Sequence, residues 1–94
     1  MATFIVRHKV KDYGIWKKAF AEHGKVRAQL GFTKSRVYRY TDEPNHVIVV
    51  SEVKDIQAAK KLASSPELAE KMKEAGVVDE PKMFFLDDGE MFPN

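Results

Sequence analysis

The sequence predicts an α+β fold with the element order strand, helix, strand, strand, helix, strand. Two segments have apolar residues at the spacing of a helix. Each lies between segments in which apolar and polar residues alternate, or in which apolar residues run continuously, as in strands. The turn-rich stretch Thr41–Asn45 joins the second and third strands closely enough to form a hairpin. Two strand–helix–strand units with right-handed crossovers make a four-stranded antiparallel sheet with both helices on one face, the ferredoxin-like arrangement. The 94 residues are expected to form a single domain, residues 1–94.

The spacing of the apolar residues changes near residue 12 from that of a strand to that of a helix. Thr3–Lys11 alternates, and one of its faces carries Phe4, Val6, His8 and Val10. Asp12 is a suitable N-cap, and we expect one continuous helix from Tyr13 to Leu30, ended by Gly31. Steps of four, three, four and three residues place a single stripe on this helix, made of Trp16, Phe20, His23, Arg27 and Leu30.

The second and third strands differ in polarity. Phe32–Thr41 alternates, and we expect one of its faces to carry Phe32, Lys34, Arg36, Tyr38 and Tyr40. His46–Lys54 has Val-Ile-Val-Val at its centre. A continuous apolar run of this kind is typical of a central strand that is buried on both faces.

The second helical region is interrupted, and a strand follows it. Asp55 caps a helix over residues 56–63, and Ser65 restarts the helix until Gly76. Lys82–Asp87 contains Met-Phe-Phe-Leu and is expected to be the fourth strand.

One face of the expected sheet has no helix to cover it. Both alternating sets of the third strand are largely apolar, and so is the fourth strand. Met91 and Phe92, in the tail Asp88–Asn94, also lack a core to join unless they pack on a partner subunit. A chain of 94 residues without cysteine has few other means of burying more apolar surface. We therefore expect a homodimer in which two sheets pack face to face about a twofold axis.

Charge and composition exclude several classes of partner. The 16 basic and 14 acidic residues leave a net charge of +2 and are interleaved, so no basic stripe for nucleic acid is expected. No apolar run approaches the ~20 residues of a membrane span, and the N-terminus does not read as a signal peptide. The chain has no glycine-rich phosphate loop, and its three histidines lack the spacing of a common zinc site. The expectation is a cytoplasmic protein that binds no metal, nucleic acid or membrane.

Several segments together carry a family resemblance over nearly the whole chain. They are residues 4–10, Asp12-Tyr13 with Trp16-Lys17, Phe20 and His23, Val37-Tyr38-Arg39 followed by residues 42–45, residues 65–68, and Ala75-Gly76-Val77. Through them the chain resembles the dimeric α/β-barrel superfamily, and within it the small proteins similar to antibiotic biosynthesis monooxygenases and polyketide cyclases. The superfamily includes cofactor-independent oxygenases, haem-degrading enzymes, cyclases, isomerases and members of no known activity.

The resemblance implies a homodimer with a pocket in each subunit, between the sheet and its helices. Haem-degrading members have a histidine ligand on the second helix, and this chain has no histidine between Asp55 and Gly76, so we expect no haem and no other cofactor. The implied activity is that of a cofactor-independent monooxygenase or cyclase acting on an aromatic or polyketide-like molecule. The alternative is a non-catalytic small-molecule-binding or stress-related dimer. A third interpretation is a structural module whose own side chains fill the pocket.

Two histidines are the candidate catalytic bases. His8 lies in mid-strand on an otherwise apolar face, and His23 lies on the helix stripe that should point at the same sheet. An imidazole titrates near neutrality and can accept a proton, although either residue can instead be a hydrogen-bonded structural histidine. Glu52, on a central strand, needs a partner, and we expect His8 to provide it, as a proton relay or as a buried ion pair.

Four other residues are candidates for contacting a substrate, together with Glu52. Trp16 and Phe20 have the helical spacing of core aromatics, which is compatible with forming the wall of a pocket for an aromatic ligand. Tyr38 and Arg36 are candidates for stabilising an oxyanion. The alternative for both is an edge-strand position with their polar ends in water.

Overall fold

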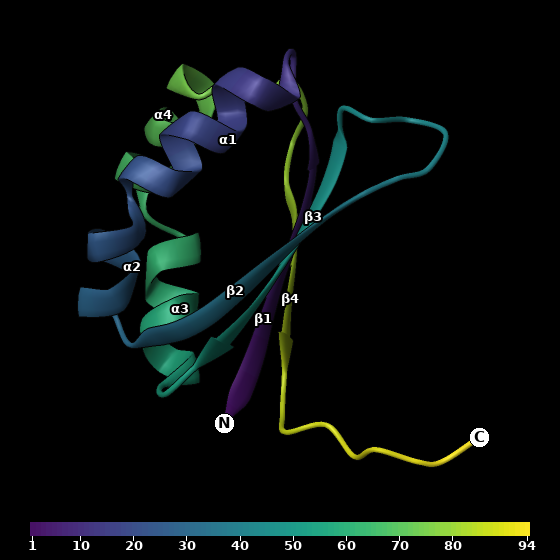
Figure 1. Ribbon diagram of the computed structural model, residues 1–94. Coiled ribbons are helices and arrows are strands. Elements are labelled where there is room, and N and C mark those ends of the chain that lie inside the picture. The colour runs from purple at the N-terminus through teal and green to yellow at the C-terminus, as the bar shows by residue number, and fades with distance from the viewer.

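Four antiparallel strands form one sheet, and four helices lie on one of its faces. The computed structural model describes residues 1–94, and Figure 1 shows the helices gathered on one side of the sheet. The strands are β1 (Ala2–Lys9), β2 (Phe32–Arg39), β3 (His46–Val53) and β4 (Lys82–Leu86), in the spatial order β2-β3-β1-β4. The helices are α1 (Tyr13–Glu22), α2 (Gly24–Gln29), α3 (Ile56–Ala63) and α4 (Pro66–Glu74). The predicted α+β fold, its hairpin and its antiparallel sheet are confirmed.

Three of the helices begin at the side chains that the sequence marks as N-caps. The Asp12 carboxylate accepts a hydrogen bond from the first turn of α1 at 3.2 Å, and the Asp55 carboxylate accepts one from α3 at 2.9 Å. The Ser65 hydroxyl accepts one from α4 at 3.3 Å. Each bond satisfies one of the backbone N–H groups that a helix start leaves free. None of the helices has both the length and the apolar character that a membrane crossing requires.

The prediction of one continuous helix from Tyr13 to Leu30 is wrong, because the helix breaks at His23. The His23 ring nitrogen Nδ1 donates a hydrogen bond to the carbonyl oxygen of Ala19 at 2.7 Å. In an unbroken helix that oxygen accepts from the backbone N–H of His23, which here turns to the carbonyl of Phe20 instead. Gly24, a poor helix former, follows directly and begins α2. The side chain of His23 has thus taken the place of a backbone bond.

The two central strands present their buried residues to the helices. Pairs of buried residues lie opposite one another on β1 and β3: Phe4 with Ser51, Val6 with Val49, and His8 with Val47. The alternate residues of the strands form a second face, here called the open face, which no helix covers. It carries Thr3, Ile5, Arg7, Lys9, Lys34, Arg36, Tyr38, His46, Ile48, Val50, Glu52, Lys82, Phe84 and Leu86. In this single chain β3 is therefore buried on one face only.

The expectation that Phe32 shares a face with Lys34 is wrong, because β2 contains an irregularity at Thr33. Phe32 pairs with Val53, whereas Lys34 pairs with Glu52, so one extra residue is accommodated between them. A bulge of this kind reverses the alternation of a strand. Phe32 consequently turns inward, where its ring meets that of Phe4 edge-on with the centroids 5.9 Å apart.

Gly76, which ends the second helical region, has a backbone conformation that other residues rarely adopt, and its replacement measures the cost of that conformation. Its φ is +95°, a conformation in which a side chain costs about 1–2 kcal/mol. A Cβ built there meets nothing closer than 3.8 Å, so the expected cost comes from the backbone alone. We expect Gly76→Ala to lower the free energy of unfolding in urea by about 1 kcal/mol or more. Gly89→Ala, where a Cβ meets open space, is the control, and an equal effect of the two changes would contradict this account.

Candidate functional site

His8 is an unusual residue in the interior between β1 and α1. Its side chain is only 2% exposed, and its Nδ1 atom has no hydrogen-bond partner. The ring meets Trp16 edge-on, with the centroids 5.5 Å apart and the planes at 67°. Most buried side-chain nitrogens are paired, because an unpaired one loses its bonds to water without replacement. His8 is buried because it lies in the middle of β1, on the face of the sheet that the helices cover.

Burial sets the protonation state of His8. Removal from water disfavours the imidazolium ion and lowers the pKa of His8 below 6.5, and His46 lowers it slightly further. The carboxylate of Asp79 raises it in part. Because burial is the larger effect, the ring is neutral at pH 7 and one of its nitrogens can accept a proton.

Three aromatic rings of α1 form a column, here called the ring column, that packs with Val10, Val47 and Val49 of the sheet side. Trp16 stacks on Phe20 with the centroids 5.0 Å apart, and Tyr13 lies 5.9 Å from Trp16 on the other side. Arginines close both ends: the guanidinium of Arg27 lies 3.6 Å from the centre of the Phe20 ring, and that of Arg39 lies 3.9 Å from that of Tyr13. Burial lowers the pKa of Arg27, whose Nη1 also donates to the Phe20 carbonyl at 2.6 Å. Trp16 and Phe20 therefore pack as core residues in this chain.

The other sequence-predicted site residues are not brought to His8. His23 is held at the junction of α1 and α2 by its bond to Ala19. The expected pairing of Glu52 with His8 is wrong, because the two residues alternate out of phase and lie on opposite faces of the sheet.

Arg36 and Tyr38 also lie on the open face, in the same rows as Val50 and Ile48. Both side chains are exposed, Tyr38 by half. In this chain they face solvent, so the edge-strand alternative describes their placement. Neither side chain lines a pocket inside one subunit. To donate a hydrogen bond to the oxyanion of a substrate, either one would need a second chain to complete the site.

A cavity of about 590 Å³ lies between α4 and the end of the sheet that carries β4, and is here called the α4–β4 cavity. Its wall is mostly apolar and includes Leu68, Ala69, Met72, Val77, Pro81 and Met83. Lys73, Asp79 and Glu80 supply its charged groups. Sequence reasoning missed this site, because its lining comes from a helix, a strand and the loop that joins them. The one signal of it in the sequence is the spacing of Leu68 and Met72, which lie four residues apart and so on one face of the helix.

Asp79 connects this cavity with His8. It belongs to the cavity wall, and its carboxylate accepts a hydrogen bond at 2.9 Å from the backbone N–H of Lys9, the neighbour of His8. Val78 extends this contact, since its N–H donates to the carbonyl of Lys9 at 2.9 Å. The segment 77–79 thus runs along the end of β1 and holds a carboxylate within electrostatic reach of the buried imidazole.

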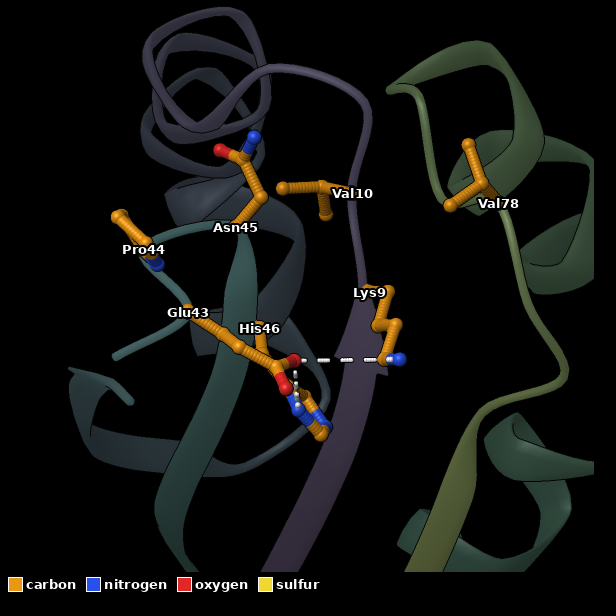
Figure 2. A pocket seen from close by; sticks show the side chains of 7 residues that line it. All are labelled: Lys9, Val10, Glu43, Pro44, Asn45, His46 and Val78. Carbon is orange, nitrogen blue, oxygen red and sulfur yellow. Dashed lines mark ion pairs between the residues drawn. The ribbon is translucent and has the colours of Figure 1, made fainter. Parts of the chain in front are cut away.

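A smaller hollow of about 290 Å³ lies where β1 ends and β3 begins, and Figure 2 shows the seven side chains that line it. Glu43 reaches between two nitrogen atoms there: its Oε2 lies 3.3 Å from Nδ1 of His46 and 3.9 Å from Nζ of Lys9. Asn45 is occupied with the backbone, accepting from the N–H of Tyr13 at 3.1 Å. The polar groups of the hollow already have partners, and no group of three histidine, cysteine or acidic side chains in the chain is placed to hold a metal ion.

No protein-family model matches the chain, and no curated protein matches it. Solved structures match it along nearly its whole length. SnoaB, a cofactor-independent oxygenase from Streptomyces nogalater, matches with a TM-score of 0.69 and 20% identity, over 99% of this chain and 97% of that one. An antibiotic biosynthesis monooxygenase matches with a TM-score of 0.68 and 14% identity, over 96% of this chain and 100% of that one. This chain has the fold of the antibiotic biosynthesis monooxygenases.

A third similar structure contains a bound molecule. The ActVA-Orf6 monooxygenase of Streptomyces coelicolor, solved in complex with nanaomycin D, matches with a TM-score of 0.62 and 20% identity, over 99% of this chain and 92% of that one. At these identities the likeness establishes the fold and leaves the reaction of this chain open. The resemblance to antibiotic biosynthesis monooxygenases that the sequence predicts is thereby confirmed for the fold.

Proposed function

We propose that the protein binds a small apolar or aromatic molecule in the α4–β4 cavity and acts on it as a cofactor-independent monooxygenase or cyclase. One observation carries the proposal: a buried, neutral His8 keeps an unpaired nitrogen, while a carboxylate of the cavity wall lies within its electrostatic reach. An unpaired buried polar atom costs about 1–3 kcal/mol. Groups kept in such a state, with a shifted pKa and a charged neighbour beside a cavity, are candidates for function.

The proposed chemistry is proton removal from the ligand. A neutral imidazole accepts a proton from a phenolic hydroxyl or an activated C–H group, and Asp79 stabilises the imidazolium that forms. The deprotonated ligand is electron-rich enough to react with molecular oxygen or to attack a carbonyl carbon of its own. The apolar wall, with Leu68, Met72 and Met83, suits a ligand with a flat hydrocarbon skeleton.

The second candidate is a small-molecule-binding dimer without catalysis. The observation in its favour is that His8 is not itself part of the cavity wall. A ligand therefore reaches the imidazole only if the segment around Asp79 moves. Without that movement the same cavity binds a ligand and leaves it unchanged.

The proposal includes a homodimer formed through the open face. Apolar side chains on three of its strands support this: Ile5 on β1, Ile48 and Val50 on β3, and Phe84 and Leu86 on β4. Phe84 and Leu86 are nearly half exposed in the single chain. Contiguous apolar surface of this kind on a sheet is characteristic of an interface. In such a dimer Arg36, Tyr38 and Glu52 are interface residues.

Two variants test the proposed site with hydroxylated naphthalenes and anthraquinones as probes. We expect a bound probe to raise the melting temperature of the wild-type protein by several degrees, and Met72→Trp, which places an indole ring in the cavity, to reduce that shift. His8→Gln should keep the shift and lose oxygen consumption or product formation. Ile15→Trp, at an exposed position of α1 outside the cavity wall, is the control for the added ring.

The outcomes separate the two candidates. A shift in melting temperature without turnover by the wild-type protein would favour the non-catalytic binder. Unchanged turnover in His8→Gln would remove His8 as the base. An undiminished shift in Met72→Trp would place the ligand elsewhere.

A further inference from the structure

The edge of the sheet bulges where the chain approaches β4. β4 pairs with β1 as far as Lys82, opposite Arg7, and a separate pair joins Val77 to Val10. Between these two pairs β1 has only residues 8 and 9, whereas the other segment has residues 78–81, here called the bulge. All the residues of the bulge line the α4–β4 cavity. Extra residues of this kind turn a strand away from its partner and are common beside active sites.

Two hydrogen bonds to Lys9 hold the bulge against the end of β1. The carbonyl of Lys9 accepts from the backbone N–H of Val78 at 2.9 Å, as in an ordinary antiparallel pair. The N–H of Lys9 donates to the carboxylate of Asp79 at 2.9 Å, where a regular ladder would offer a backbone carbonyl. Figure 2 shows Val78 on the segment that runs beside Lys9. The side chain of Asp79 has thus replaced the backbone acceptor that the extra residues remove.

The bulge occupies the position that adjoins His8. Met83 of the cavity wall pairs with Val6 and so lies on the helix-covered face of the sheet, as His8 does. If the pairing of β4 continued past Lys82, Pro81 would stand opposite His8. Proline cannot donate to a ladder, which favours the departure of the chain at this point. The cavity and the imidazole therefore lie on one face of the sheet, with the bulge beside both.

We infer that the bulge is a gate between the α4–β4 cavity and His8, and that the hydrogen bond from Lys9 to Asp79 is its latch. The inference rests on the proposed function and adds how a ligand in the cavity reaches the imidazole. With the latch closed, His8 is 2% exposed and takes no part in the cavity wall. With the latch open, the bulge moves away from β1 and the cavity extends to the unpaired Nδ1 atom.

The bulge is anchored at its two ends and exposed between them. At one end the N–H of Lys11 donates to the carbonyl of Gly76 at 2.8 Å, and at the other end β4 begins at Lys82. Three of the four residues of the bulge are exposed. Segments with little buried surface open at a lower free energy than the sheet that they adjoin. The bonds to Lys9 are therefore the contacts that an opening movement has to break.

Amide hydrogen exchange followed by NMR tests the latch without any ligand. In Asp79→Ala the Lys9 amide loses its acceptor and should exchange about tenfold faster or more. The Val78 amide keeps its own acceptor, and it should also exchange faster, because the latch holds the whole bulge. The Val6 amide, in the middle of β1, should be unchanged. Glu80→Ala, which removes the neighbouring carboxylate of the bulge, is the matched control and should leave all these rates at the wild-type values.

Modification by diethyl pyrocarbonate tests whether the gate leads to His8. This small reagent acylates neutral imidazoles and requires no turnover. We expect His8 to react slowly in the wild-type protein and about tenfold faster in Asp79→Ala, in step with exchange at Val78. His23 and His46, which the bulge does not cover, should keep their rates. Adding Met72→Trp to Asp79→Ala should slow the reaction of His8 again, because the reagent enters through the cavity.

The outcomes distinguish the gate from the proposed reaction. Faster exchange confined to Lys9 would show that Asp79 only satisfies one N–H group, and it would overturn the latch. An unchanged rate of His8 modification in Asp79→Ala would overturn the gate, even if the wild-type protein turns over a probe. The expected exchange and modification rates in a protein that turns over no probe would support the gate and count against the reaction alone.

Discussion

Replacement of Trp16 by alanine is expected to destabilise the protein by about 3–5 kcal/mol. Trp16 is 4% exposed and lies at the centre of the ring column, in contact with Phe20, Tyr13 and His8. Its removal leaves a cavity under α1 that the small neighbouring residues of β3 cannot fill. Because a domain of this size has a total stability of about 5–15 kcal/mol, the variant should lose a large fraction of that stability.

The measurement is urea denaturation followed by circular dichroism, since Trp16 is the only tryptophan and its fluorescence is lost with it. Trp16→Phe, which keeps a ring in the column, should retain a large part of the stability and keep the experiment interpretable. Val26→Ala, on the exposed side of α2, should change the free energy of unfolding by about 0.5 kcal/mol or less. Equal effects of Trp16→Ala and Val26→Ala would show that the ring column does not support the fold.

Local signals account for the part of the fold that the sequence predicts well. The N-caps Asp12, Asp55 and Ser65 act on the first turn of their own helices, and Gly31 and Gly76 both adopt the positive φ expected after a helix end. Such effects depend on a few neighbouring residues and can be recognised without the rest of the chain. The break of the first helix escaped prediction because it depends on a side-chain bond of His23 that competes with the backbone.

The candidate site depends on register, which the sequence specifies weakly. Pairing Glu52 with His8 requires both to share a face, yet the observed register places Glu52 beside Thr3 and His8 beside Val47. A shift of one residue reverses the face of every side chain in a strand, so an alternation pattern alone cannot match two strands. The α4–β4 cavity was missed for a related reason, since Met72 and Asp79 come together only through tertiary packing.

The burial of His8 affects both the stability of the fold and the proposed reaction. Burial without a partner for Nδ1 is unfavourable for the fold, and the same burial keeps the ring neutral and able to accept a proton at pH 7. A hydrogen bond at Nδ1 would make the burial of His8 less costly, but that nitrogen would then be occupied. A stability measurement can therefore probe the property on which the proposed reaction depends.

The free energy of unfolding is expected to fall as the pH is lowered below 6.5. The pKa of His8 is lowered in the folded protein by burial, and in the unfolded chain it returns to about 6.5. Between these two pKa values the unfolded state binds more protons, so stability decreases as pH falls, with a slope of at most about 1.4 kcal/mol per pH unit. Well above pH 6.5 both states are neutral at His8 and the residue adds no pH dependence.

Urea denaturation between pH 7.5 and pH 5, above the range in which most carboxylates titrate, measures this slope. In His8→Leu the slope should largely disappear, and at pH 5 the variant should be more stable than the wild type, because no buried imidazole has to be kept neutral. Val26→Ala, which removes no titratable group, should keep the wild-type slope. Asp79→Asn should steepen the loss, since the carboxylate of Asp79 raises the pKa of His8 toward its unfolded value. A slope that survives in His8→Leu would assign the titration to another group and would remove the evidence for a neutral, proton-accepting His8.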